Sequence, residues 1–279
     1  SYQRHYFFQN GTELPLSDSI LQYDDETGYY KIYQNGKGFL YTSDLKQVIK
    51  FECDDVFVLV PTRYTTETSQ QYFAFRKNQK IGLCDQAGTI ILPPNYLQIF
   101  HAGADRFVVT VDSLYGLVDK TGTYSIDPIY TFIEAVGSDF FRVHDHDKKG
   151  IMDKTGKVIV PIQYDEVYFS DRGILTLKNS NYGFYDLEGK QILANTWSHV
   201  FQLAQNSYEM VNYNNTRCIV NANGLQTPLN CKNVYLGSET MKYYTDNSIV
   251  VITYVDGEKL DSTISVSYTH LTLPTNREV

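Results

Sequence analysis

A repeat of about 34 residues is the feature that most constrains this 279-residue chain. Its clearest copies start at Ile81, Tyr115, Lys149 and Tyr182, and each carries a glycine followed by a second glycine six residues later. The first glycines of these copies are Gly82, Gly116, Gly150 and Gly183. Regular periodicity of this length is typical of solenoids, propellers and other repeat arrays.

The same frame extends to weaker copies on both sides. The eight anchor positions are His5, Gly38, Gly82, Gly116, Gly150, Gly183, Cys218 and Val251. Seven intervals separate them, and all are 33 to 35 residues long except the interval from Gly38 to Gly82, which is 44. We therefore expect a single β-repeat domain over residues 1–265, with one insertion.

Each clear copy predicts a hairpin. An aspartate stands three residues before the second glycine, a spacing typical of a type I turn closed by glycine at positive φ. These aspartates are Asp85, Asp119, Asp153 and Asp186. The strand before the turn is apolar on both faces, as at Leu83 and Cys84. Because a strand with two apolar faces must be covered above and below, we expect the sheets to stack.

Four short strands fill each copy. The second strand is expected to end near a proline, as at Pro93, Pro128 or Pro161, and the third to start at an aromatic residue fourteen positions after the anchor. These aromatic residues are Tyr96, Tyr130, Tyr164 and Trp197. The fold class is therefore all-β, made of tandem antiparallel β-meanders. A propeller-like ring is preferred to an open superhelical array, which buries neighbouring units equally well.

The segment from Lys149 to Val167, KGIMDKTGKVIVPIQYDEV, resembles the bacterial WG-containing repeat family. The resemblance covers most of residues 5–260 and is strongest in the four clear copies. The tryptophan that gives the family its name is replaced by Ile81, Tyr115, Lys149 and Tyr182. The resemblance implies a β-repeat architecture in a bacterium and brings no catalytic motif with it.

The last fourteen residues, 266–279, break the repeat pattern. They resemble a translated sequencing-library adapter, and we expect them to be a non-native tail. Most of the cysteines are expected to be buried thiols, and a disulfide between Cys218 and Cys231, which lie in one repeat, is the alternative in an oxidising compartment.

Charge and hydropathy limit the partners. With a net charge of −8, the chain is not expected to bind nucleic acid, which requires clustered lysine and arginine. No apolar run reaches the roughly 18 residues that a membrane helix needs, so we expect no membrane insertion within this chain. The cell envelope or secretion is favoured over the cytoplasm.

The insertion is the best candidate binding site, because loops on a rigid scaffold often carry function. The alternative is a tolerated polar excursion. Its candidate residues are Arg63, Tyr64, Thr65, Thr66, Glu67 and Gln70.

Two other features are interpreted structurally. The sequence His144-Asp145-His146-Asp147 has the composition of a metal site, but its place in the repeat favours a polar hairpin tip. The repeated aromatic residues named above could form a carbohydrate-binding surface, but their period favours packing, and Tyr64 and Tyr213 are less constrained.

No catalytic motif, cofactor or metal is expected, since the chain has no phosphate-binding loop, no HExxH and no G-x-S-x-G. The leading hypothesis is a non-enzymatic repeat scaffold that binds a protein or a carbohydrate ligand in a bacterium. The alternative is a fragment of a larger protein whose catalytic or membrane-anchoring part lies outside this chain.

Overall fold

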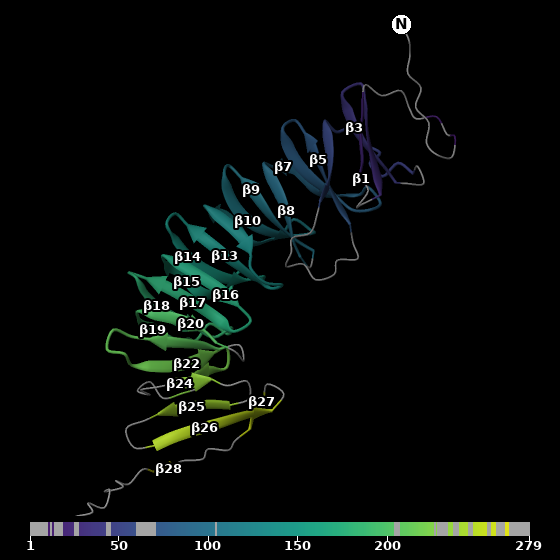
Figure 1. Cartoon of the computed structure of the whole chain (residues 1–279). Coiled ribbons are helices and arrows are strands. Elements are labelled where there is room, and N and C mark those ends of the chain that lie inside the picture. Colours follow the sequence, from purple (N-terminus) through teal and green to yellow (C-terminus); the bar gives the residue numbers. More distant parts are fainter. Residues whose placement is uncertain are drawn as a thin grey trace, which may run out of the picture. The chain divides into compact units, whose positions relative to one another are not determined.

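Short antiparallel sheets repeat along the chain in the computed structural model (Figure 1). The structure describes residues 11, 13, 19–24, 28–42, 46–59, 71–103, 105–203, 207–225, 227, 234–236, 240–244, 248–255, 258–260 and 266–267. Within these residues there are strands and turns and no helix. The all-β fold of repeated antiparallel meanders is thereby confirmed.

The first three sheets contain eleven strands. In the order in which neighbours pair, they are β1 (Ser19–Asp24), β2 (Tyr29–Gln34) and β3 (Lys37–Thr42); β4 (Asp55–Leu59), β5 (Tyr72–Lys77), β6 (Lys80–Cys84) and β7 (Ile90–Tyr96); and β11 (Tyr124–Tyr130), β10 (Leu114–Asp119), β9 (Arg106–Val111) and β8 (Gln98–Gly103).

Four further sheets follow. Their strands, in order of pairing, are β12 (Phe132–Ala135), β13 (Phe140–Asp145), β14 (Lys148–Asp153) and β15 (Val158–Tyr164); β16 (Glu166–Ser170), β17 (Gly173–Lys178), β18 (Asn181–Tyr185) and β19 (Gln191–Trp197); β20 (His199–Gln202), β21 (Tyr208–Val211), β22 (Arg217–Asn221) and β23 (Gly224–Leu225); and β24 (Val234–Leu236), β25 (Thr240–Tyr244), β26 (Ser248–Val255) and β27 (Glu258–Leu260), with β28 (Val266–Ser267) also pairing with β26.

The chain divides into two compact units. Unit 1 comprises Ser1–His146 and Met152–Lys157, and unit 2 comprises Asp147–Ile151 and Val158–Val279. Each unit is described by itself below.

The β5–β6 and β17–β18 hairpins turn within two residues. Both central residues have positive φ, at 51° and 64° for Asn78 and Gln79 and at 50° and 63° for Asn179 and Ser180. This conformation is a type I′ turn, whose twist matches the right-handed twist of the flanking strands. Small polar residues at these tips therefore keep the hairpins short.

The aspartate turns form as the sequence predicts. The amide of Gly156 donates to the carbonyl of Asp153 at 3.0 Å, while the Asp153 carboxylate accepts the amides of Thr155 and Lys157. Gly156 has a φ of 86°, and a Cβ atom there would lie 2.0 Å from the carbonyl oxygen of Ser125 in the preceding sheet. Glycine therefore both closes the turn and lets two sheets approach.

The core lies between stacked sheets. In unit 1, Leu83 on β6 and Val118 on β10 have no exposed surface and belong to one apolar cluster. In unit 2, Phe184 on β18 and Cys218 on β22 are buried together in a second cluster. Both faces of the strand that carries the anchor residue are thus covered, as its two apolar faces predict.

The course of β7 differs from the expectation. Strand β7 continues through Pro93 and Pro94 to Tyr96, so the third expected strand starts only at Gln98. Proline is tolerated there because β7 lies at the edge of its sheet, where the strand needs no outward donor. Seven sheets correspond to seven anchors, and the eighth anchor, His5, lies outside the described residues.

The expected non-native tail is described only at its start. Val266 and Ser267, its first two residues, pair with Ile249 and Ser248 of β26. The remainder of the tail, 268–279, lies outside the described residues.

Candidate binding surface

The outer strand that begins each of four successive sheets carries an exposed pair of side chains. These strands, β8, β12, β16 and β20, each lie at an edge of their sheet. The pair stands 16 and 18 residues after the anchor, and positions two apart on a strand point to the same face. We call these side chains the edge pairs: Gln98 with Phe100, Phe132 with Glu134, Glu166 with Tyr168, and His199 with Phe201.

Every edge pair combines one aromatic ring with one hydrogen-bonding side chain. The rings of Phe100, Phe132, Tyr168 and Phe201 are 46%, 38%, 46% and 50% exposed. The residues between the members of a pair point inward, and Ile99, Ile133 and Val167 are buried. The alternation therefore holds each pair on the open side of a strand whose other face is in the core.

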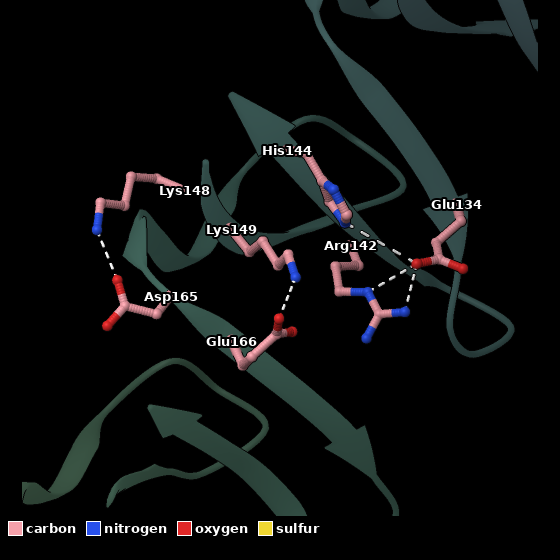
Figure 2. Close-up of polar contacts among 7 residues, drawn as sticks. All are labelled: Glu134, Arg142, His144, Lys148, Lys149, Asp165 and Glu166. Atoms are coloured by element: carbon pink, nitrogen blue, oxygen red, sulfur yellow. Dashed lines mark hydrogen bonds and ion pairs between the residues drawn. The ribbon is translucent and has the colours of Figure 1, made fainter. Parts of the chain in front are cut away.

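In the second edge pair of unit 1 the polar member, Glu134, is an acid whose charge is matched. Glu134 accepts a hydrogen bond from Arg142 Nε at 2.7 Å, and its Oε1 lies 4.0 Å from His144 Nε2 (Figure 2). The rings of His144 and Tyr115 each meet the ring of Phe132 edge-on, with centroids 5.2 Å apart. The Phe132 and Glu134 pair is thus held in place by its neighbours.

In unit 2 the charges are matched in the same way. Lys149 Nζ donates to Glu166, and Lys148 Nζ donates to Asp165 at 2.6 Å (Figure 2). The hydrogen bond from Lys148 holds the pKa of Asp165 below its usual value. Asp165 also accepts the amide of Asn179 at 2.8 Å, which anchors the hairpin tip.

The Phe201 ring lies opposite another ion pair. Phe201 on β20 is directly across from Glu209 on β21, and Arg217 Nη1 donates to Glu209 at 2.7 Å. The side chain of Glu209 is only 12% exposed, so its charge is largely shielded as well as paired.

The insertion proposed as a binding loop lies outside the described residues. This holds for Arg63, Tyr64, Thr65, Thr66, Glu67 and Gln70. The flanking strands β4 and β5 pair with each other, so the insertion joins adjacent strands of one sheet.

The segment from His144 to Asp147 is a hairpin tip, as the repeat predicts. Strand β13 ends at Asp145, and His146 follows in a turn with a φ of 53°. His144 is half-buried beside Glu134, whereas the His146 side chain is 86% exposed and its Nδ1 lies 2.8 Å from Asp145. Within the described ranges, no three His, Cys, Asp or Glu side chains are grouped to hold a metal ion.

The repeated aromatic residues named in the sequence are packing residues. Tyr96, Tyr164 and Trp197 are buried, and Tyr130 is half-buried. Tyr213, outside the pattern, is 73% exposed. The sequence analysis did not find the edge pairs. The usable signal was one aromatic and one polar residue, in either order, at the positions 16 and 18 residues after the anchor of each clear copy.

The described cysteines are buried. Burial raises the pKa of the Cys53 thiol to about 11 and that of Cys84 to about 12. Cys218 is buried too, as expected of a thiol, and Cys231, its possible disulfide partner, lies outside the described residues. No helix in the described part of the chain is long and apolar enough to cross a membrane.

Residues 115–148 and 150–179 match the family described as the WG containing repeat. These two segments are similar to WG-containing repeats. The match confirms the resemblance on two adjacent copies, and both carry an edge pair. In these two segments Tyr115 and Lys149 stand at the position of the tryptophan. No curated protein matches the chain.

Several solved structures show a distant likeness. They include BamB from Moraxella catarrhalis, at 10% identity over 90% of this chain and 91% of that chain, with a TM-score of 0.34. Hsv2p from Kluyveromyces lactis is 10% identical over 92% and 100%, with a TM-score of 0.33. AztD from Citrobacter koseri is 10% identical over 92% and 90%, with a TM-score of 0.26. The fold assignment rests on the match to the WG containing repeat and on the sheets themselves. The chain is a β-repeat scaffold.

Proposed function

We propose that this chain is a non-enzymatic repeat scaffold of a bacterium that binds a protein or carbohydrate ligand through its edge pairs. The observation that carries the proposal is the exposure of Phe100, Phe132, Tyr168 and Phe201 at matching places on four sheets. Aromatic rings supply a large apolar contact area with little loss of side-chain freedom on binding, so a repeated exposed ring is a common binding element.

The sheets supply the rigidity that such a surface needs. Buried residues next to the rings, such as Ile99 and Val167, fix the edge strands to the core. A ligand would therefore meet side chains that are already in position, which lowers the entropic cost of association.

The test is binding by the full chain to a glycan array and to an extract of bacterial envelope proteins. The variant carries Phe100→Ala, Phe132→Ala, Tyr168→Ala and Phe201→Ala together, and the control is Tyr213→Ala, which removes an exposed ring from outside the pairs. We expect the fourfold variant to lose binding and the control to keep it. Equal binding by both, no bound ligand, or hydrolytic activity in the chain would refute the proposal.

A further inference from the structure

The edge pairs have the chemistry of a carbohydrate subsite. A pyranose ring has an apolar face of C–H groups and a rim of hydroxyls, so it needs a flat apolar partner and a hydrogen-bonding partner side by side. Each edge pair supplies both on one face of one strand, as in Gln98 with Phe100 and His199 with Phe201. Ser198 Oγ lies 2.9 Å from His199 Nδ1 and helps to orient that imidazole.

The charges around the rings indicate a neutral ligand. Glu134 is matched by Arg142, and Glu166 is matched by Lys149. The charge beside Phe201, on Glu209, is matched by Arg217. Paired charges leave polar atoms on the surface but little net electrostatic potential to attract a charged ligand. The chain's net charge of −8 would also repel a polyanion.

The spacing of the rings indicates a linear ligand. One ring recurs on each of the four sheets that contain β8, β12, β16 and β20, and stacked sheets lie about 10 Å apart. Within unit 1 this places Phe100 and Phe132 on successive sheets, and within unit 2 it places Tyr168 and Phe201 likewise. Protein interfaces instead gather their aromatic anchors near the centre of a patch of roughly 800 Å² per partner.

We infer that the edge pairs bind a neutral, linear polysaccharide, with each ring stacked on one sugar and the polar member bonded to that sugar's hydroxyls. This inference rests on the proposed function and names its ligand class. Two rings in each unit engage one chain, so binding strengthens with ligand length through the raised effective concentration at the second ring.

The test is gel electrophoresis of the full chain in the presence of neutral polysaccharides, using laminarin, hydroxyethyl cellulose, glucomannan and dextran as probes. We expect at least one of them to retard the wild-type chain. Tyr168→Ala and Phe201→Ala should each weaken this binding roughly tenfold. The matched control Tyr213→Ala should leave it unchanged, and circular dichroism confirms that each variant is folded.

Each of the following results would overturn the inference. One is that none of the four polysaccharides retards the chain. Another is that Tyr213→Ala weakens binding as much as Phe201→Ala, which would place the contact outside the edge pairs. The third is that a sulfated polymer such as heparin binds more tightly than any neutral probe. Capture of an envelope protein that depends on the four rings, without polysaccharide binding, would refute this inference while leaving the scaffold function standing.

Discussion

His101 is a buried histidine with an unmet hydrogen-bonding atom. It lies on β8 with 1% of its surface exposed, and no described residue bonds its Nε2. Its ring stacks on Phe107 at 5.4 Å and meets Tyr72 edge-on at 5.5 Å. Burial lowers the pKa of His101 below its ordinary value of 6.5, and the nearby Asp105 only partly opposes the effect. Burial therefore favours the neutral form of this imidazole in the folded chain.

This environment makes unit 1 sensitive to acid. Because the folded-state pKa lies below 6.5, the unfolded chain binds a proton that the folded chain does not, and stability falls as the pH drops through that value. The loss is at most about 1.4 kcal/mol per pH unit. Urea unfolding from about pH 7.5 to about pH 5 should show it.

The variant His101→Phe should flatten that dependence while keeping the ring contacts. The carboxylate of Asp105 remains in both proteins, bonded to Tyr72 and Lys120. His146→Asn removes an exposed histidine and should leave the slope unchanged. A wild-type slope that survives in His101→Phe would show that another group is responsible.

At the scale of elements, the second glycine of each turn has two roles that can be separated. Gly156 and Gly122 have nearly equal φ values of 86° and 83°. A Cβ atom at Gly156 would lie 2.0 Å from the Ser125 carbonyl oxygen, whereas at Gly122 the nearest atom would be Leu92 Cδ2 at 3.4 Å. Only a side chain at position 156 would therefore force the two sheets to move apart.

We expect Gly122→Ala to cost about 1 kcal/mol of unfolding free energy, from the positive φ alone. Gly156→Ala should cost at least about 2 kcal/mol more, because a backbone atom cannot give way as a side chain does. Chemical denaturation of the two variants measures the difference. Equal costs would show that the approach of the sheets at Gly156 is not tight.

The hairpin tips predict a stabilising change. Ser180 adopts a φ of 63°, which a residue other than glycine adopts at some cost, while the first described hairpin already has Asn35 followed by Gly36. Ser180→Gly should therefore raise stability by about 0.5 kcal/mol. Thermal unfolding checks this, and Ser170→Gly, in a strand, should lower stability instead.

At the scale of the whole molecule, a stack of sheets is stabilised mainly by contacts between neighbours. Phe73 is fully buried in a cluster of unit 1, and Trp197, the single tryptophan, is buried in a cluster of unit 2. Fluorescence from Trp197 therefore reports on unit 2, while far-UV circular dichroism reports on all sheets.

Phe73→Ala should cost about 3–5 kcal/mol locally. We expect the unfolding transition followed by circular dichroism to begin at a lower denaturant concentration. The midpoint of the Trp197 fluorescence transition should change little, because each repeat contacts only its neighbours. Met210→Ala, beside Trp197, should move the fluorescence midpoint. If Phe73→Ala moves both signals equally, the repeats unfold as one cooperative domain, as a closed propeller-like ring would.

The sequence by itself determined the parts that local chemistry controls. The spacing of Asp153 and Gly156 implied the turn, and the two-sided apolar strand around Leu83 implied stacked sheets, because turn geometry and hydrophobic burial are encoded within a few residues. The course of β7 through Pro93 was not predictable, since only its place at a sheet edge makes proline acceptable there.

Only the tertiary structure separated the two classes of repeated aromatic residue. Tyr164 and Tyr168 both recur at fixed offsets, yet the first is 2% exposed and the second 46%. Periodicity shows that a position is equivalent from unit to unit, but burial depends on which strand lies at the edge of a sheet and which face the next sheet covers. That pairing of strands decided which rings are core and which are available to a ligand.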